Sequence, residues 1–136
     1  MPDVIEDLTA RVLAFRDARD WGQFHSPKNL SMALACEAAE IMDLFRWLTE
    51  AESVERANTT AHAWPHLVEE IGDVGVFLLV FCRATGVDLR EAILAALAKA
   101  EVKYPVERSR GRAEKWTTYR DASGIADRDV TGRRSA

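Results

Sequence analysis

Four acidic residues form two pairs in this sequence, each with a spacing of three residues. Glu37 and Glu40 lie in "SMALACEAAEIMDLFRWL" (31–48), and Glu70 and Asp73 lie in "LVEEIGDVGVFLLVF" (67–81). On a helix, residues three apart lie on the same side. Carboxylate oxygens without His or Cys partners are the ligands that suit Mg²⁺ or Mn²⁺. The spacing therefore predicts a divalent-metal site formed by two helices.

Both acid pairs are expected on the apolar faces of their helices. On a helical wheel Glu37 lies in the middle of an apolar stripe, with Glu40 at its flank, and Asp73 likewise flanks Glu70. Buried carboxylates that lie close together repel one another, and each costs several kcal/mol to desolvate. That cost is offset by a bound cation or by structural ion pairs with Arg46, Arg83 or Lys99, or else the acidic faces are more exposed to water than the helical wheel suggests.

Iron is the alternative to magnesium in a helical carboxylate site. A di-iron bundle has Glu-x-x-His on two of its helices. Neither Glu37 nor Glu70 is followed by His three residues later. His62 and His66 are four residues apart, but Pro65 is expected to begin a helix between them. The ligand set therefore favours Mg²⁺ or Mn²⁺ over iron.

Helix signals dominate the chain and define the elements that must position these acids. Apolar residues recur at helical intervals, and capping residues and prolines bound the segments. We expect helices over residues 3–20, 27–49, 65–86 and 88–105, with a polar bridge at 49–62. This pattern predicts an all-α fold, a four-helix bundle. We assign residues 1–116 to its single domain and residues 117–136 to a polar, flexible tail.

The third predicted helix is apolar almost all round between residues 71 and 81. Such a helix needs contacts on every side, which one small bundle does not provide. We therefore expect the chain to oligomerise through its helices, as a homodimer or homotetramer.

Charge and hydropathy exclude other classes of protein. A net charge of −4 argues against binding a nucleic-acid polymer, which needs clustered positive charge. The longest apolar run, "VGVFLLVFC", is shorter than the roughly 20 residues that span a bilayer. Cys36 and Cys82 form no CxxC motif and are expected to be small, buried, reduced thiols. With no secretory leader pattern at the start of the sequence, these features predict a soluble, cytoplasmic protein without membrane or nucleic-acid partners.

Aromatic and basic residues near the acids suggest a planar, anionic ligand. Trp21 and His25 precede the first acid pair, and Trp47 is expected two turns past Glu40 on the same helix. Nucleobases stack on such aromatic rings; the alternative is that the tryptophans only pack at a helix entry and in the core. For a triphosphate the candidate cations are Lys99, Lys103 and Lys115. Their alternative role is to compensate the helix dipole.

The motifs together resemble a known family. "RDWGQFHSPKNL", "EAAE", "EIGD" and "KYP" follow in the order found in the MazG-like all-α nucleoside triphosphate pyrophosphohydrolases, closest to their dCTP pyrophosphatase branch. The resemblance implies that Glu37, Glu40, Glu70 and Asp73 hold Mg²⁺ and form the catalytic site. It also implies that Trp21, His25 and Trp47 line the nucleobase site. Glu69 is a further acidic candidate.

The activity implied by the resemblance is hydrolysis of dCTP, or of a related or modified pyrimidine nucleotide, to the monophosphate and pyrophosphate. Such an enzyme would cleanse the nucleotide pool. Three positions depart from the family pattern: Ala96 replaces Lys, Ala100 replaces Asn, and Phe77 stands in the substrate site where dCTP-directed relatives often have Tyr. These departures keep one alternative open, a non-catalytic helical module that binds nucleotide or a protein partner.

Overall fold

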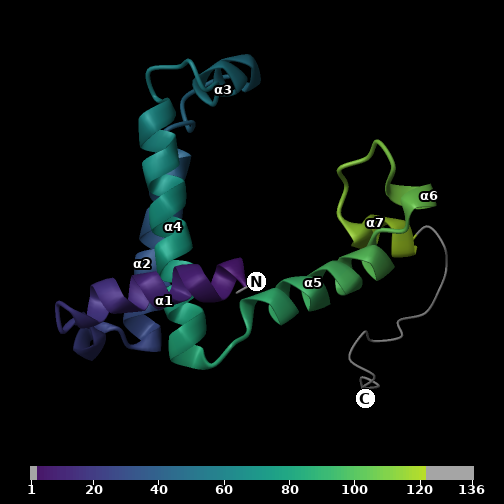
Figure 1. Ribbon diagram of the computed structural model, residues 1–136. Helices are drawn as coiled ribbons and strands as arrows, with labels where there is room; N and C mark the ends of the chain where they lie inside the picture. The colour runs from purple at the N-terminus through teal and green to yellow at the C-terminus, as the bar shows by residue number, and fades with distance from the viewer. Residues whose placement is uncertain (1–2, 122–136) are drawn as a thin grey trace. The chain divides into compact units, whose positions relative to one another are not determined.

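The computed structural model describes residues 3–121, and all its regular elements are helical. They are α1 (Val4–Asp17), the 3₁₀ helix η1 (Trp21–Phe24), α2 (Pro27–Asp43), α3 (Glu50–Arg56), α4 (Trp64–Thr85), α5 (Leu89–Lys103), α6 (Val106–Ser109) and α7 (Trp116–Asp121) (Figure 1). The predicted all-α class is confirmed. The four long helices, α1, α2, α4 and α5, correspond to the four that the sequence predicts.

Side-chain caps fix the beginning of three of these helices. The Asp3 carboxylate accepts a hydrogen bond from the backbone N–H of Ile5 at 2.9 Å, at the start of α1. The Ser26 hydroxyl accepts from Asn29 at 3.2 Å, and α2 begins at the adjacent proline. Asp88 accepts from the backbone N–H of Glu91 at 3.0 Å before α5. Each cap satisfies a donor that the first helical turn leaves unpaired, as predicted.

Gly86 ends α4 in the left-handed conformation, with φ of 71°. This conformation costs a side chain with a Cβ atom about 1–2 kcal/mol, and glycine avoids that cost. The predicted end of the helix is therefore confirmed.

Two boundaries around residue 50 differ from the prediction. Helix α2 ends at Asp43 rather than near Thr49, because Leu44 donates to the carbonyl three residues back, at 3.2 Å, and tightens the chain into turns. The predicted polar bridge contains α3, which begins with a capping box in which Thr49 and Glu52 bond reciprocally. Thr49 and Glu52 have the three-residue spacing of a capping box, which predicts the start of a helix. The polar composition of the segment made it look like a loop instead.

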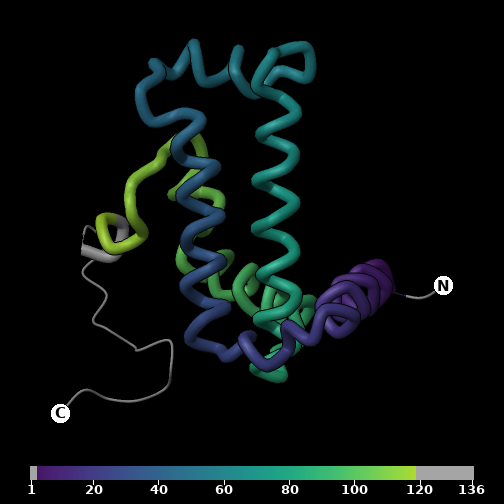
Figure 2. Tube along the Cα trace, turned by 90° about the vertical axis from the view of Figure 1, so that its left-hand side faces the viewer, coloured from purple at the N-terminus to yellow at the C-terminus, as the bar shows by residue number. Residues whose placement is uncertain are grey.

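The first of two compact units, residues 1–92, contains the two helices that carry the acid pairs. Helices α2 and α4 lie side by side and antiparallel, with α3 near the turn between them (Figures 1 and 2). Helix α1 crosses α4 toward the carboxyl end of α4, and η1 contacts α1. In the described part of the chain only four apolar side chains are buried: Leu30, Leu67, Val80 and Cys82. Cys36, the other cysteine, is exposed, so the expectation that both thiols are buried holds for Cys82 alone.

Many apolar side chains of the described residues remain exposed. On α4 the exposed fraction is 54% for Ile71 and 51% for Val68. The other helices of one chain therefore cover only part of the apolar surface of α4. None of the described helices is long and apolar enough to cross a membrane.

The second unit, residues 93–136, holds most of α5 and the short helices α6 and α7. The Lys103 ammonium lies 5.5 Å from the centroid of the Trp116 ring and links α5 to the start of α7. Helix α7 includes the first residues of the predicted tail, and the remainder of that tail lies outside the described residues.

Candidate metal centre and substrate-binding residues

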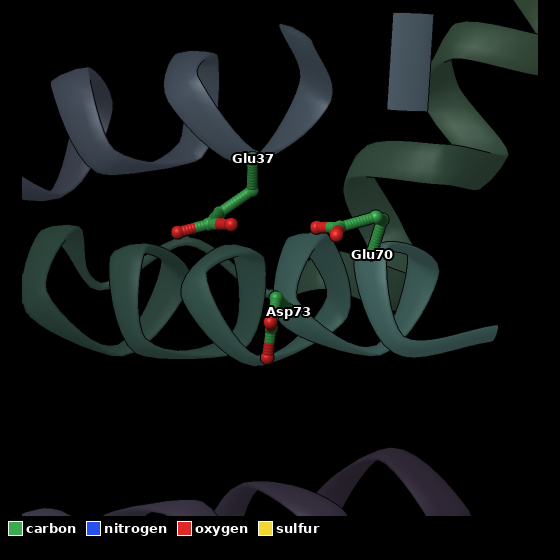
Figure 3. A group of neighbouring side chains, drawn as sticks. All are labelled: Glu37, Glu70 and Asp73. Atoms are coloured by element: carbon green, nitrogen blue, oxygen red, sulfur yellow. The ribbon is translucent and has the colours of Figure 1, made fainter. Parts of the chain in front are cut away.

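Three of the four predicted acids converge between α2 and α4. Glu37, Glu70 and Asp73 each offer a carboxylate oxygen, and these oxygens all lie within 4.8 Å of one another. Glu37 extends from α2 toward α4, and the carboxylate of Glu70 points toward it, while Asp73 projects from the next turn of α4 (Figure 3). The antiparallel packing of the two helices therefore brings together acids that are more than 30 residues apart in sequence.

This spacing fits a small hard cation after a modest adjustment. Two oxygens bound to one Mg²⁺ at about 2.1 Å can be at most about 4.2 Å apart. The observed limit of 4.8 Å is slightly larger, and side-chain rotation can close the difference. An all-oxygen ligand set is the kind that Mg²⁺ or Mn²⁺ prefers, so the residues present fit a divalent metal.

The acids are more accessible than the helical wheel predicted. Glu37 and Glu70 are half-buried, whereas Glu40 and Asp73 are exposed, and no charged side chain among the described residues is fully buried. The prediction of buried carboxylates is therefore wrong for the single chain, and the alternative of acidic faces that are more exposed to water describes Glu40 and Asp73. The physical reason is that α2 and α4 cover only the side of each acid pair that faces the other helix. Among the described residues, no third helix packs extensively against α2.

Structural ion pairs do not account for the acids. Within residues 3–121, no Lys, Arg or His forms an ion pair with any of the four. Arg46, one of the predicted partners, instead pairs with Asp43 at 3.2 Å. No basic side chain of the described residues therefore offsets the negative charge of the cluster through an ion pair.

The acids perturb one another's protonation. Partial burial raises the pKa of Glu37 above its ordinary value, and the charges of Glu40 and Asp73 raise it further. The pKa of Glu70 is raised for the same reasons, first by burial and then by Glu40, Glu69, Asp73 and Glu37. Glu40 lies outside the convergent trio but belongs to the same negatively charged cluster, as the sequence spacing predicted.

Trp21 lies on η1 and packs against α1. Its ring meets that of Phe15 edge to face, with centroids 5.8 Å apart, and the Arg19 guanidinium lies 3.6 Å from the Phe15 centroid. Trp21 is still 44% exposed, so a face of the indole is available to a ligand. The contact with Phe15 fits the packing interpretation, and the role of Trp21 in ligand binding stays a prediction.

His25 follows η1 directly and is half-buried. Its Nδ1 atom is buried and finds no hydrogen-bond partner among the described residues. A buried imidazole nitrogen without a partner is unfavourable, since such groups are normally paired. This atom is the feature of His25 that a ligand could satisfy.

Trp47 does not lie on α2, contrary to the prediction, because the helix ends at Asp43. Its side chain is 84% exposed, and the Arg46 guanidinium lies 5.3 Å from the centre of its ring. The interpretation of Trp47 as a core residue is therefore excluded. Trp21 and His25 precede α2 and Trp47 follows it, and a helix of 17 residues is about 25 Å long. One copy of the chain thus holds these aromatics at opposite ends of α2.

The remaining predicted substrate residues are distributed over both units. Phe77 is half-buried on α4, four residues after Asp73 and hence on the same side of the helix. On α5, Lys99 is exposed and Lys103 is half-buried beside Trp116; Lys115 is exposed.

A cavity of about 460 Å³ lies elsewhere in the first unit. Its lining comes from α1, the carboxyl end of α4 and residues 87–90, and includes Arg83 and the buried Cys82. Burial raises the pKa of the Cys82 thiol, which keeps it protonated. None of the predicted site residues lines this cavity.

Sequence reasoning did not single out two arginines at the carboxyl end of α6. Arg108 and Arg110 are exposed and lie in the second unit, where basic residues outnumber acidic ones by 10 to 6. That local excess is visible in the sequence, although the overall negative charge of the chain conceals it.

The chain is similar to proteins of known activity. Residues 32–118 match the model of the MazG-like family. The chain is 36% identical to dCTP pyrophosphatase 1 of Mus musculus and 33% identical to that of Homo sapiens. Each alignment covers 83% of this chain and 66% of the relative, so the chain spans about two thirds of the length of these curated relatives.

A crystal structure of a pyrophosphatase from Archaeoglobus fulgidus has a similar fold. Its TM-score is 0.71 at 32% sequence identity, over 77% of this chain and 95% of that one. The family match includes both acid pairs, and the structural match is to an all-helical fold of the same kind. The resemblance carried by the sequence motifs is confirmed: the chain belongs to the MazG-like family.

Proposed function

We propose that this protein is a Mg²⁺-dependent nucleotide pyrophosphohydrolase that converts dCTP, or a related or modified pyrimidine deoxynucleotide, to the monophosphate and pyrophosphate. The observation that carries the proposal is the convergence of Glu37, Glu70 and Asp73 without compensating cations. The relatives named dCTP pyrophosphatase 1 and the archaeal pyrophosphatase support this type of activity. Removal of such nucleotides from the cytoplasmic pool is the role that we propose for this activity.

The carboxylates of Glu37, Glu40, Glu70 and Asp73 would hold the metal. When bound there, Mg²⁺ would neutralise the phosphates and lower the pKa of a coordinated water. The acids contribute fixed negative charge that attracts the cation, and their half-exposed position leaves room for a nucleotide. Glu69 faces His66 at 3.9 Å rather than the trio, which makes it a weaker candidate to accept a proton.

The nucleobase site requires a second copy of the chain. Because Trp21 and His25 lie about 25 Å from Trp47 along α2, one copy cannot place all three around one base. In a homodimer or homotetramer, Trp47 of one copy could stack on a base whose edge meets His25 of another. The exposed apolar side chains of α4 support such an assembly.

The alternative function is a non-catalytic helical module that binds nucleotide. The observation that favours it is the replacement of the family's Lys and Asn by Ala96 and Ala100 on α5. Against it, an apolar scaffold would be more stable without the uncompensated acids.

The test is pyrophosphate release from canonical and 5-substituted deoxynucleoside and ribonucleoside triphosphates, with and without Mg²⁺. We expect metal-dependent release that favours dCTP-type substrates. Binding of dCTP without any release by the folded protein would instead support the non-catalytic module.

Site-directed variants connect that activity to the acids. Glu40→Gln and Asp73→Asn should each lower turnover by at least about a hundredfold while circular dichroism remains helical. Glu55→Gln, an exposed acid on α3, is the matched control and should retain full activity. Full activity in both site variants would contradict the proposed centre.

A further inference from the structure

The cavity of about 460 Å³ in the first unit is separate from the acid cluster, because none of the four acids lines it. Its walls are α1, the last two turns of α4 and residues 87–90, all of which belong to the unit of residues 1–92. Helix α1 packs against α4 here, where it crosses the carboxyl end of that helix (Figure 1). Pockets that hold small organic ligands have volumes of about 300–1,000 Å³. The cavity is therefore large enough for such a ligand.

The lining of the cavity changes from charged to apolar along both helices. The charged end is marked by the ion pair between Asp3, at the start of α1, and Arg90, at 3.6 Å. On α1, Leu13 lies almost three turns beyond Asp3. On α4, Leu79 lies about one turn before Arg83, on the side away from residues 87–90. A ligand that has one charged group and an apolar body matches this division.

Arg83 is the cation of this cavity that no acid neutralises. The sequence suggested it as a partner of the acid pairs, but it forms no ion pair with any residue among 3–121. The neighbouring charged groups are engaged, since Asp3 caps α1 and faces Arg90, and Asp88 caps α5. A guanidinium can form two parallel hydrogen bonds to one carboxylate, and its charge does not depend on pH in the neutral range. Arg83 is therefore the group with which an anionic ligand would pair.

The balance of charge limits how negative that ligand can be. Three acidic and two basic side chains line the cavity, so its walls carry one more negative than positive charge. Glu6 is the acid among them that neither caps a helix nor forms an ion pair with a described residue. It would repel the several charges of a polyphosphate, whereas Arg83 matches a single one. The cavity thus selects a monoanion.

We propose that this cavity binds a small organic monoanion, a carboxylate on an apolar body, which pairs with Arg83 and lies against Leu13 and Leu79. The inference does not depend on the proposed function, because the cavity shares no residue with the acid cluster. Its ligand contacts α1, α4 and the residues that join α4 to α5. Binding therefore stabilises the folded arrangement of these elements by mass action.

The direct test is calorimetric titration of the full chain with decanoate below its micellar concentration. We expect Arg83→Gln to weaken decanoate binding about tenfold, the loss of one charge-assisted contact. Arg83→Lys should recover part of the affinity, because it keeps the charge and loses only the paired geometry. Arg11→Gln removes an exposed cation of α1 that does not line the cavity, and it serves as the charge-matched control with unchanged affinity. Butanoate should bind at least about tenfold more weakly than decanoate, because it buries less apolar surface.

The two cysteines locate the bound carboxylate. Cys82 is buried in the lining of the cavity, and Cys36 is exposed on α2 and serves as an internal reference. Decanoate should slow alkylation of Cys82 by iodoacetamide and leave the rate at Cys36 unchanged, whereas in Arg83→Gln the same concentration should protect Cys82 less.

Three results would overturn the proposal. The first is that the folded wild type binds no decanoate at millimolar concentration, and the second is that wild type and Arg83→Gln bind it equally. The third is protection of Cys82 that increases with protein concentration and not with decanoate, because another copy of the chain would then fill the cavity. Circular dichroism and the elution volume of each variant establish that it is folded.

Discussion

At the scale of single residues, the clustered acids lower the stability of the metal-free protein and at the same time provide ligands for a cation. Glu37 and Glu70 lie partly out of water and face other carboxylates, and both effects raise their pKa values. A chain that uses these acids only for folding would gain by replacing them with neutral side chains. Their cost without metal is therefore a measurable sign of their role.

Glu70→Gln should make the metal-free protein more stable near neutral pH. The pKa of Glu70 is raised from 4.5, so the folded state favours the protonated form more than the unfolded state does. Its destabilising effect is absent below pH 4.5 and develops as pH rises through the folded-state pKa. Thermal unfolding in EDTA at pH 4 and pH 8 should show an advantage of the variant only at pH 8, and added Mg²⁺ should reverse it. A variant less stable than the wild type at pH 8 in EDTA would contradict this account.

Trp47→Ala should raise KM about tenfold, since stacking of a base on an aromatic ring contributes roughly 1–3 kcal/mol. Because the side chain is 84% exposed, the melting temperature of the isolated chain should not change. Steady-state kinetics and calorimetry on the same sample measure both quantities. An unchanged KM would remove Trp47 from the substrate site.

Trp21→Ala provides the contrast, because Trp21 packs against Phe15 as well as facing solvent. We expect it to lower the free energy of unfolding by about 1 kcal/mol, the contribution of one aromatic pair. Denaturant titration measures this loss. Equal stability of the two tryptophan variants would show that the contact with Phe15 contributes nothing.

The residue types of the metal site could be read from the sequence, but their surroundings could not. The i, i+3 spacing correctly places Glu70 and Asp73 together on α4, and antiparallel pairing brings Glu37 to them. A helical wheel shows only direction around an axis, so it marks Glu37 as buried whether or not another helix covers it. It also places Trp47 on α2 by assuming that the helix continues beyond Asp43.

At the scale of elements, the caps explain which boundaries were predictable. Asp3, Ser26 and Asp88 each lie where a polar residue precedes an apolar periodic segment, and each caps a helix. Helix α3 has an equally clear cap but no apolar stripe of its own, so periodicity alone cannot find it. Local hydrogen bonding, rather than burial, determines where this helix begins.

Helix α3 should therefore lose stability in acid. The hydrogen bonds from Thr49 lower the pKa of Glu52, so this interaction stabilises the folded chain above the ordinary glutamate pKa of 4.5 and is lost as pH falls through the folded-state value. The protection factor of the Ser53 amide, which is the intrinsic exchange rate divided by the observed rate, should fall below that pH in the wild type. Glu52→Gln should show faster exchange at neutral pH and a weaker pH dependence. An identical profile for the two proteins would exclude the capping box as the cause.

Two glycines on α4 can be used to test whether another chain packs closely against that helix. A Cβ atom added at Gly72 or Gly75 would meet no heavy atom within 4 Å, and glycine inside a helix costs about 1 kcal/mol relative to alanine. If nothing packs there, Gly75→Ala should stabilise the protein by about that amount. If a second copy approaches α4 closely, as we propose, the substitution should weaken association instead. Sedimentation and thermal unfolding of the variant distinguish the two results.

At the scale of the whole molecule, the first unit has little interior of its own. Only four apolar side chains are buried among the described residues, and large ones such as Val4, Val68 and Ile71 are about half exposed or more. The all-round apolar character of residues 71–81 predicts such exposure, because a bundle of one small chain cannot cover every side of that helix. Hydrophobic periodicity does not predict which helix faces pack against each other, because that depends on how the side chains of two folded helices fit together.

The melting temperature should therefore rise with protein concentration. Association that buries the exposed apolar faces stabilises the folded chain by mass action. Calorimetric scans over a hundredfold range of concentration would show this shift, and sedimentation equilibrium would give the number of copies. A monomer with a concentration-independent transition would contradict both the assembly and the two-copy base site.

The same scarcity of buried side chains has a consequence for how quickly the protein matures. If helices α2 and α4 need a neighbouring copy to cover their apolar sides, the last step of refolding is the association of two chains. The half-time of this step should then decrease as the concentration of the chain increases. In a cell, the rate of expression would therefore determine how long a newly made chain waits before it is part of an active enzyme. During that interval the uncovered helices are the surface that chaperones and proteases encounter first.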